Sequence, residues 1–594
     1  MLDKYSPFHM AARACGDYFR LSRGLGVFEQ ITVIAHSLSW TLGLILTQVL
    51  FDAVAASTVY TNFWYIGTPL AILVLITIFQ QVISGASDFL FVKASYNNMA
   101  KFMMRLQYKL SKLAAIKFED TDFLNDIDRS KNCISNQVLG MFAYVCLRGI
   151  TYYFVLFASI AVYLFYLSPL LGLVILMAFI PAVFGQIARV KLFSNLEDEV
   201  AALRRKNDYY KQAVTSKRLF NETRILGAYI YFKNLFIETL TLINKKTWKT
   251  EKKAFLMRLI LNLVSIIGLV VSIILLFQAT ISGDISIGAF AAIFAVLSQI
   301  FSIMQDAVSD SLSKGSRYLG QVKNYYRLMD IEETKKEDGI FDIDKGVEVF
   351  DVSFSYPNRS DLAIKEVSLS IKKGETLAIV GKNGSGKTTL VRLLIGLYSP
   401  DKGIVRVAGL DTQKVNSKSI FKGVSAIFQN FQRYKMTLEK NVCISDTKKP
   451  VKKEEIIKVL DYTEFNYNNI NLDTMLSPEF DGIDLSGGQW QRLSISRGIY
   501  RKSDFMVLDE PTSSIDPLEE TKLYNQFRNI SKDKTVVIVT HRLGLAKLAD
   551  RIVVMENGKI DSIGTHTELI EKEGVYAYMY NLQAESFKST LSKI

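Results

Sequence analysis

Cysteine and histidine are rare in this chain of 594 residues, which contains four of each. The cysteines, at Cys15, Cys133, Cys146 and Cys443, are far apart, and no two of them form a C-x-x-C pair. A zinc site needs closely spaced cysteine and histidine ligands, and a disulfide framework needs cysteines at paired spacings. The sequence therefore indicates neither kind of site, and the cysteines are expected to be free thiols.

Charged side chains are missing from several stretches that are long enough to cross a membrane as a helix, which takes about 20 residues. The uncharged stretch Gly149–Ala188 is twice that length and is interrupted at Ser168-Pro169, so two spans joined by a tight turn are expected. The other expected spans are Gln30–Phe51, Ile66–Ser87, Leu259–Gly283 and Ile285–Gln305. The sequence thus predicts six membrane-spanning helices surrounded by lipid.

Lysine and arginine are missing from every second connection between these spans. The connections Lys93–Val138 and Lys191–Ala254 contain 8 and 14 of them, whereas Ala53–Ile66, Phe165–Leu170 and Ala279–Ile287 contain none. Basic connections remain in the cytosol, so the long connections and both termini are expected there, in a multi-pass protein of the cytoplasmic membrane. The same segments account for much of the formal net charge of +13, and no nucleic-acid partner is needed to explain it.

The two basic connections have a charged, helical pattern, which suggests that the membrane helices continue into the cytosol and pair there as hairpins. Each contains a short amphipathic stretch, Glu119–Ser130 in the first and Asn221–Phe232 in the second. Cap-type Asp, Asn and Thr residues near their starts favour short helices that dock on another part of the protein. Ordinary loop helices are the alternative, and these residues alone do not decide between the two.

The composition changes after about Met329. Residues 330–345 include the polar stretch Glu332–Gly339 and are expected to form a linker. The segment that follows, VEVFDVSFSYP, alternates apolar and polar residues as strands do. The sequence therefore predicts a transmembrane domain at residues 1–329, this linker, and a cytosolic domain at residues 346–594.

A phosphate-binding loop is predicted within Thr376–Leu390, TLAIVGKNGSGKTTL, where a strand-like run enters G-x-x-x-x-G-K-[ST] and leaves into an apolar helix. The glycines allow backbone N–H groups to surround phosphate oxygens, Lys387 can reach the β and γ phosphates, and Thr388 can offer its hydroxyl to Mg²⁺. The predicted fold class is therefore an all-α six-helix membrane domain followed by an α/β P-loop domain. The nucleotide-binding residues predicted here are Gly381, Asn383, Gly384, Ser385, Gly386, Lys387, Thr388 and Thr389.

Two carboxylates follow another apolar run in DFMVLDEP, Asp504–Pro511. Asp509 is expected to help to hold Mg²⁺, and Glu510 to polarise the attacking water as a general base. A further apolar run, VVIVTHRL, ends near His541, which is expected to contact the γ-phosphate. Either motif alone is more often structural, so both predictions depend on the P-loop.

The order of the motifs resembles that of ATP-binding cassette (ABC) proteins. The resemblance rests, in chain order, on Tyr356, GKNGSGKT, Gln429, LSGGQ, VLDE, SSID and His541. Six spans followed by one cassette resemble a half-size exporter of that superfamily, so the resemblance covers essentially the whole chain. It implies an ATP hydrolase that uses ATP and Mg²⁺ to drive alternating access of a membrane cavity.

The same resemblance implies roles for residues that the P-loop pattern does not include. Tyr356 would stack on adenine, and Gln429 would sense Mg²⁺ and the attacking water. Asp516 would belong to the loop that links two nucleotide sites, and His541 would recognise the γ-phosphate. The two amphipathic stretches would be coupling helices that dock on the cassettes.

The stretch LSGGQ implies a second subunit, because in that family two cassettes pack head to tail. Ser486, Gly487, Gly488 and Gln489 would hold the γ-phosphate of ATP that is bound by the partner. Since this chain has one P-loop and one such signature, it would complete no site alone. A homodimer is the economical prediction, because Glu510 and the signature are both intact; pairing with a different half-transporter is the alternative.

The cargo is predicted from cassette details. Trp490 follows the signature, and NFQRYKMTLEKNV follows at Asn430 in place of a more usual E-P-x-L-F pattern. Both features resemble exporters of lanthipeptides and related bacteriocins. The first span begins about 30 residues in, so no room is expected for the leader-trimming protease of many peptide exporters. Peptide export is the leading prediction; export of lipid, glycolipid or small drugs, a soluble cassette ATPase, and an ATP-gated channel are the alternatives.

Overall fold

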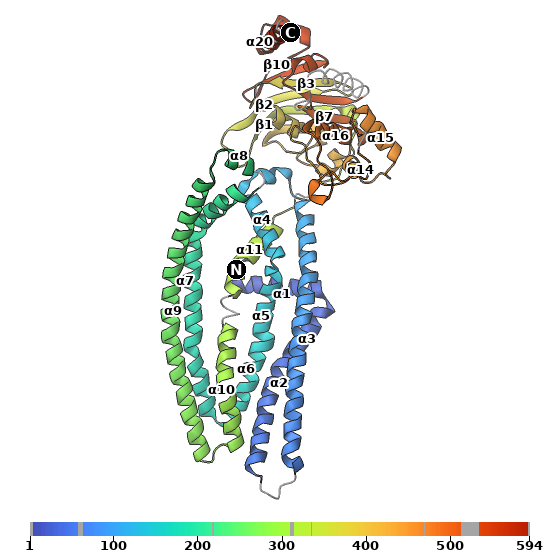
Figure 1. Ribbon diagram of the computed structural model, residues 1–594. Helices are drawn as coiled ribbons and strands as arrows, with labels where there is room; N and C mark the ends of the chain where they lie inside the picture. Colours follow the sequence, from blue (N-terminus) through green and yellow to red (C-terminus); the bar gives the residue numbers. More distant parts are fainter. Residues whose placement is uncertain are drawn as a thin grey trace. The chain divides into compact units, whose positions relative to one another are not determined.

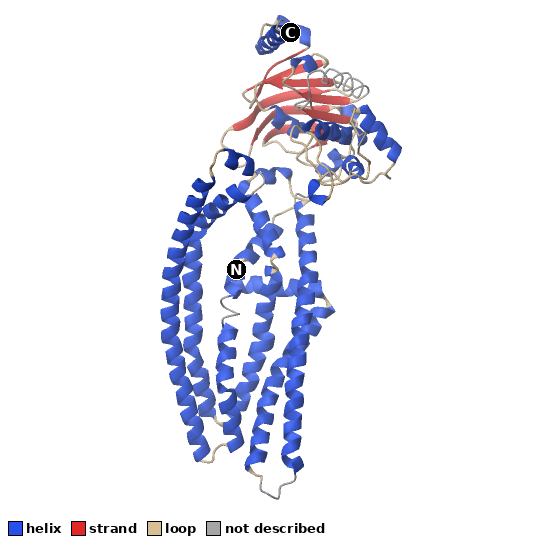
Figure 2. Ribbon diagram, in the orientation of Figure 1, coloured by secondary structure: helices blue, strands red, loops and turns tan. Residues whose placement is uncertain are grey.

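The chain divides into two compact units, each of which is considered by itself. The computed structural model describes residues 4–57, 63–216, 219–308, 314–333, 336–467, 470–511 and 534–591. The first unit comprises Met1–Ser111 and Asn125–Ile331, and the second comprises Lys112–Leu124 and Glu332–Ile594. In the described residues, the strands belong to the second unit (Figure 2).

Long helices make up the first unit (Figure 1). In chain order they are α1 (Pro7–Ser22), α2 (Gly24–Ala55), α3 (Phe63–Leu110), α4 (Thr121–Ser135), α5 (Val138–Arg148), the π-helix η2 (Gly149–Phe154), α6 (Val155–Leu167), α7 (Pro169–Thr215), α8 (Phe220–Ile225), α9 (Tyr229–Ile281), α10 (Ile287–Val308) and α11 (Gly315–Met329).

Each predicted span falls on its own helical stretch. Ser168 is the N-cap of α7 and Pro169 its first residue, so the chain turns where the sequence predicts. Proline is favoured at this position because its missing N–H would have no partner there. In the described residues, the helical stretches long and apolar enough to cross a membrane are Gly24–Ala55, Phe63–Leu110, Val138–Leu167 and Tyr229–Ile281, and α10 adds the shorter apolar stretch Ile287–Leu297.

Helices α7 and α9 run side by side along their lengths and are joined through α8 (Figure 1). Their backbones approach closely at Gly268, where an added Cβ would lie 2.4 Å from the Cβ of Ala178. Small residues permit such an approach between membrane helices. The expected pairing of the second basic connection as a helical hairpin is therefore present in the structure.

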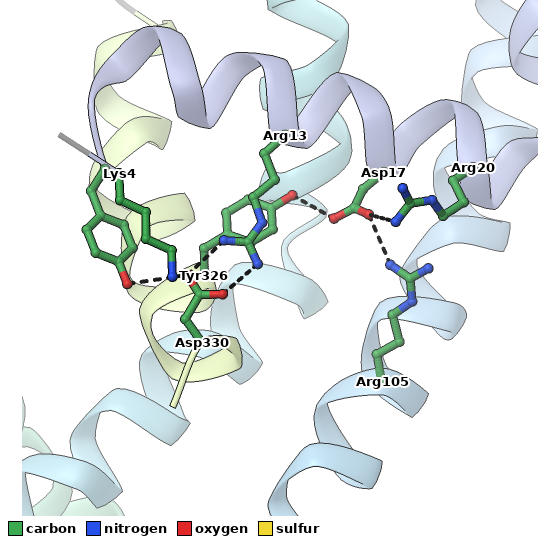
Figure 3. Close-up of polar contacts among 8 residues, drawn as sticks. Lys4, Arg13, Asp17, Arg20, Arg105, Tyr326 and Asp330 are labelled. Atoms are coloured by element: carbon green, nitrogen blue, oxygen red, sulfur yellow. Dashed lines mark hydrogen bonds and ion pairs between the residues drawn. The ribbon is translucent and has the colours of Figure 1, made fainter. Parts of the chain in front are cut away.

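The N-terminal helix α1 is bound to the last helix of the unit by charged groups (Figure 3). Arg13 donates to both oxygens of Asp330, at 2.8 and 2.7 Å, directly after α11 ends. Asp17 accepts from Tyr326 at 2.9 Å and from Arg105 of α3 at 3.2 Å. The adjoining face of α1 is buried. These bonds hold together three helices that are far apart in the sequence.

Strands form two sheets among the described residues of the second unit. One has the order β2-β1-β4-β5 and the other β10-β9-β3-β8-β7-β6. The first contains β1 (Val347–Ser355), β2 (Leu362–Ile371), β4 (Lys402–Val407) and β5 (Leu410–Asp411), and the second β3 (Thr376–Gly381), β6 (Val424–Ile427), β7 (Phe505–Asp509), β8 (Thr535–Val539), β9 (Arg551–Glu556) and β10 (Lys559–Gly564).

In the second sheet β6, β7, β8, β3 and β9 are parallel, whereas β10 returns antiparallel to β9. Their near-continuous apolar runs are buried, as expected for strands that are covered on both faces. The α-helices described in this unit are α12 (Lys387–Leu394), α13 (Ser417–Phe421), α14 (Leu438–Cys443), α15 (Lys453–Tyr462), α16 (Gly487–Tyr500), α18 (Leu543–Ala546), α19 (His566–Glu571) and α20 (Val575–Leu591).

The main apolar core of the second unit packs both sheets against α12. It includes Val347 of β1, Leu377 of β3, Leu390 of α12, Val507 of β7 and Val553 of β9. This core fixes the carboxyl ends of the parallel strands relative to the helix that follows β3. Ligands of open α/β sheets bind at that edge.

Candidate functional site

The predicted P-loop connects β3 to α12 and has the backbone of a phosphate cradle. Gly381, Gly384 and Gly386 have φ values of 151, 78 and 102°, in the range that favours glycine. A Cβ at Gly381 would lie 2.2 Å from the carbonyl oxygen of Met555, so no larger residue fits there. The loop leads into the amino end of α12, where free N–H groups and the helix dipole favour an anion.

Lys387 is folded back onto this loop. Its Nζ donates to the carbonyl oxygens of Gly381 and Lys382, both at 2.9 Å. Burial lowers the pKa of the Lys387 ammonium, and the carboxylates of Glu510 and Asp509 oppose that shift. The ammonium is thus held at the mouth of the cradle, where a phosphate oxygen could replace a carbonyl partner.

The residues assigned to Mg²⁺ lie together. Thr388, Gln429 and Asp509 line one cavity of about 310 Å³. Asp509, the last residue of β7, is only 1% exposed, and within the described part of the chain its Oδ1 has no hydrogen-bond partner. Burial raises the pKa of Asp509 to about 6, opposed by a hydrogen bond from Thr388. A buried oxygen without a partner fits a hard divalent cation, which prefers such ligands.

The predicted catalytic residues also come together. Glu510 follows β7; its Oε1 is 2.7 Å from Nε2 of His541, beyond the end of β8, and its Oε2 accepts from Nε2 of Gln429 at 2.5 Å. Glu510 has a φ of 50°, an unusual backbone for a residue other than glycine. Burial and the charge of Lys387 lower the pKa of His541, and its interaction with the carboxylate of Glu510 opposes that shift.

Tyr356 lies immediately after β1 and beside the P-loop helix. Its hydroxyl is 3.0 Å from Oγ1 of Thr389. The rings of Phe354 and Tyr398 meet it edge to face, with centroids 5.3 and 6.1 Å away. This placement brings the predicted adenine-stacking residue to the same site as the phosphate cradle.

The signature residues begin α16. Ser486 is the N-cap: its Oγ accepts from the N–H of Gln489 at 3.2 Å, and Oε1 of Gln489 accepts from the N–H of Ser486 at 2.9 Å. This capping box leaves the first-turn N–H groups of Gly487 and Gly488 without intrahelical partners. Ser486 and Gly487 are exposed, and a Cβ on Gly487 would meet nothing within 4 Å. The helix start is open to an anion from outside this chain.

Asp516, the residue predicted to belong to the loop that links two nucleotide sites, lies outside the described residues. Trp490, the residue that suggested a peptide exporter, is 1% exposed, and its indole Nε1 donates to Asp484 at 3.0 Å. Trp490 therefore packs the start of α16 into an apolar cluster, and its buried side chain cannot contact a cargo.

Sequence reasoning missed Arg392, which donates to the hydroxyl of Tyr356, and Tyr398 and Glu119, to which Arg392 is also bonded. Arg392 donates to Tyr356 at 3.3 Å, to Tyr398 at 3.0 Å and to Glu119 at 3.0 Å. The one available signal was the position of Arg392 on the helix that follows the P-loop, one turn beyond Thr388 and Thr389.

Comparison with known proteins finds a matching family model and several similar transport proteins. The "ABC transporter" family model matches residues 364–513. The subtilin transport ATP-binding protein SpaT of Bacillus subtilis is 30% identical over 85% of this chain and 83% of its own length. The nisin transport ATP-binding protein NisT of Lactococcus lactis is 28% identical over 85% of both chains. An ATP-dependent lipid A-core flippase of Vibrio vulnificus is 30% identical over 54% of this chain and 56% of its own.

A solved structure shares the fold. The "Structure of a bacterial Atm1-family ABC exporter with ATP bound" superposes with a TM-score of 0.77 at 19% identity, covering 95% of this chain and 99% of that one. The predicted fold class, apolar membrane helices followed by an α/β P-loop domain, is confirmed.

The buried carboxyl group of Asp509, whose Oδ1 has no hydrogen-bond partner in the described part of the chain, leads to a stability prediction for protein without added nucleotide. We expect Asp509→Asn to raise the free energy of unfolding of the second unit by about 2–3 kcal/mol above pH 6. Burial raises the folded-state pKa to about 6, so ionisation of the buried carboxyl costs stability above that pH. As the pH falls from 6 to about 4, both folded and unfolded forms become protonated and the difference disappears.

Denaturant unfolding at pH 8 and pH 5 measures this effect. Asp504→Asn, an exposed acid at the other end of β7, is the matched control and should be neutral at both values. A loss of stability in Asp509→Asn at pH 8 would contradict the interpretation that ionisation of the buried Asp509 carboxyl destabilises the protein.

The position of Glu510 generates a second prediction. We expect Glu510→Gln to bind ATP but to hydrolyse it at least about 100-fold more slowly, because an amide cannot accept the proton of the attacking water. Binding of a fluorescent ATP analogue and steady-state phosphate release measure the two effects. Glu366→Gln is the control, since Glu366 shares the left-handed backbone, with a φ of 51°, but is exposed on β2. Wild-type turnover in Glu510→Gln would exclude Glu510 as the base.

Proposed function

The chain belongs to the ABC transporter family, and from that membership we propose that it exports a peptide of the lanthipeptide or bacteriocin kind across the cytoplasmic membrane, driven by ATP hydrolysis. The observation that carries the proposal is the extent of similarity to SpaT and NisT, which are named for subtilin and nisin transport. That similarity covers 85% of this chain and therefore reaches well into the membrane helices, which must contact any cargo.

Export of a lipid is the second candidate. It is supported by the lipid A-core flippase of Vibrio vulnificus, at the same 30% identity as SpaT but over 54% of this chain. A match of that extent can come largely from the cassette and the helices next to it. Because the matches to SpaT and NisT cover more of this chain than the match to the flippase does, peptide export is favoured over lipid export.

A second copy of the chain completes the site in this proposal. The P-loop of one chain would face the exposed N-terminus of α16 in the other, where the N–H groups of Gly487 and Gly488 can bind an anion. Support also comes from the segment around α8, which exposes large apolar side chains. Ile225 is 86% exposed, Leu226 69% and Ile230 67%. Exposed apolar clusters of this kind mark interaction surfaces, and the cassette of a second copy is the proposed partner.

In the proposed reaction, a water molecule attacks the γ-phosphorus of ATP, the bond to the bridging oxygen of ADP breaks, and Glu510 accepts the proton of the water. Gln429 and His541 hold the two oxygens of Glu510, so its carboxylate is oriented before the substrate arrives. Lys387 and the loop N–H groups bind the transferred phosphoryl group. Thr388, Gln429 and Asp509 would hold Mg²⁺, which would supply neutralisation of phosphate charge.

The proposed orientation places the second unit and both termini in the cytosol. It is supported by the basic residues of the two long connections and by the need for cytosolic ATP. ATP binding closes two cassettes because the signature N–H groups contact the nucleotide only in the closed pair. Closure then moves the helices that carry the coupling segments.

Mixed subunits test whether the ATP site is shared. Lys387→Ala removes the P-loop ammonium of one subunit, and Ser486→Tyr blocks the signature of the other. Each substitution should inactivate a homodimer, whereas a heterodimer of the two, purified through different tags, retains one intact P-loop facing one intact signature. We expect it to regain up to half of the wild-type hydrolysis rate. An inactive heterodimer, or an active Ser486→Tyr homodimer, would exclude a site shared between copies.

Cargo is tested with the protein in liposomes. We expect a bacteriocin-type precursor peptide, ideally one encoded beside this chain, to raise ATP hydrolysis severalfold and to accumulate on the side opposite the cassettes. A lipid A-type glycolipid is the competitor, and Glu510→Gln vesicles are the control for passive leakage. Stimulation by the glycolipid and not by the peptide would replace the first candidate with the second.

A further inference from the structure

Arg392 joins the adenine-side tyrosine to a segment that lies far away in the sequence. Its Nη1 donates to Oε1 of Glu119 at 3.0 Å and to the hydroxyls of Tyr398 and Tyr356 at 3.0 and 3.3 Å. Tyr398 donates in turn to the same oxygen of Glu119, at 2.5 Å. The guanidinium also lies over the Tyr398 ring, 5.4 Å from its centroid. A planar guanidinium with several acceptors has little freedom to reorient.

The phenol of Tyr356 is consequently held at its hydroxyl end. Thr389 and Arg392, both on α12, contact that hydroxyl at 3.0 and 3.3 Å. Phe354 and Tyr398 limit the ring from the sides through edge-to-face contacts. Stacking on a flat base requires the ring plane to be fixed, and these contacts fix it.

Glu119 ends the short helix η1 (Ala115–Glu119), which lies in the segment 112–124 between α3 and the body of α4. This segment belongs to the second unit by its packing. Ala115 and Ile116 pack against the main apolar core, and Asp120 accepts from Asn358, two residues beyond Tyr356, at 3.1 Å. The segment 112–124 is thus bonded to the Tyr356 loop directly and through Arg392.

The segment 112–124 also lines the cavity that contains the candidate cation site. Ala115, Glu119 and Arg392 line the cavity of about 310 Å³ that also contains Thr388 and Asp509. Among the residues that line it, Arg392 is bonded both to Glu119 and to Tyr356.

We propose that Arg392 is a positioning residue for ATP binding: held by Glu119, it sets the orientation in which Tyr356 receives the adenine, and it ties that orientation to the segment 112–124. This inference rests on the proposed function, because the contact of Tyr356 with adenine is part of that proposal. A merely structural Arg392 would stabilise α12 and affect all ligands of the P-loop alike. A positioning Arg392 acts on the base and leaves the phosphate cradle unchanged.

The test compares ATP with inorganic triphosphate, which has the phosphates but no base. In the purified full-length protein, we expect Arg392→Gln to raise the KM for ATP about fivefold, the effect of losing one hydrogen bond, with little change in kcat. The concentration of inorganic triphosphate that inhibits hydrolysis should be unchanged. Glu119→Gln, which leaves α12 intact, should raise the KM for ATP in the same direction by a smaller factor.

Tyr356→Phe keeps the ring and removes the hydroxyl, so it should reproduce the effect of Arg392→Gln, and the double variant should be no worse than either single one. Arg406→Gln is the matched control, because Arg406 on β4 pairs with Glu348 on β1, at 3.3 Å, and lies outside the network. It should retain the wild-type KM.

The outcomes separate the inference from its premise. If Tyr356→Ala leaves the KM for ATP unchanged, Tyr356 does not contact adenine, and the positioning role of Arg392 is rejected together with that premise. If Tyr356→Ala raises the KM but Arg392→Gln and Glu119→Gln do not, the inference alone is overturned. Equal weakening of ATP and triphosphate by Arg392→Gln, or full additivity with Tyr356→Phe, would also overturn it, in favour of a structural role.

Discussion

Parallel strands end at a common edge of their sheet, and this constraint places the P-loop, both carboxylates and His541 together. β3 ends at Gly381 and delivers the P-loop, β7 ends at Asp509 and delivers both carboxylates, and His541 follows the end of β8. Because β3 pairs with β8 and β8 with β7, these three ends are neighbours. Apolar burial on both faces of the sheet fixes their spacing, so the site is built by the core and needs few bonds of its own.

The charged residues at that edge are held in energetically unfavourable or constrained arrangements. Asp509 is buried with one oxygen unpaired in the described part of the chain, Glu510 has a strained backbone, and Lys387 is turned onto its own loop. In the proposed function, a triphosphate with a divalent cation would supply an anion for the ammonium and the cradle and a cation for the carboxylate.

Local pattern in the sequence was enough to identify this edge, because each motif is contiguous and its strand and helix flanks have distinct periodicities. The Ser168-Pro169 turn was predictable for the same reason. Contacts such as Arg392–Glu119 and Arg13–Asp330 were not, since they join residues hundreds of positions apart and no short-range pattern indicates which residue is the partner of which. Trp490 follows the signature as in peptide exporters, and the similarity to SpaT and NisT bears that resemblance out, although its buried side chain packs within the protein and marks no cargo contact.

The segment 112–124 and the segment around α8 overlap the two stretches proposed as coupling helices. They differ in what covers their side chains, which in the proposed function bears on how force is transmitted. The segment 112–124 packs on the core of its own second unit, although α3 before it and most of α4 after it belong to the first. Because the chain is continuous, a displacement of the second unit must displace the ends of both helices. The segment around α8 instead exposes Ile225 and Leu226. If a second copy covers these side chains, each cassette pulls one helix pair of its own chain and another of its partner. Neither subunit could then move independently, and two ATP molecules would act on one membrane cavity.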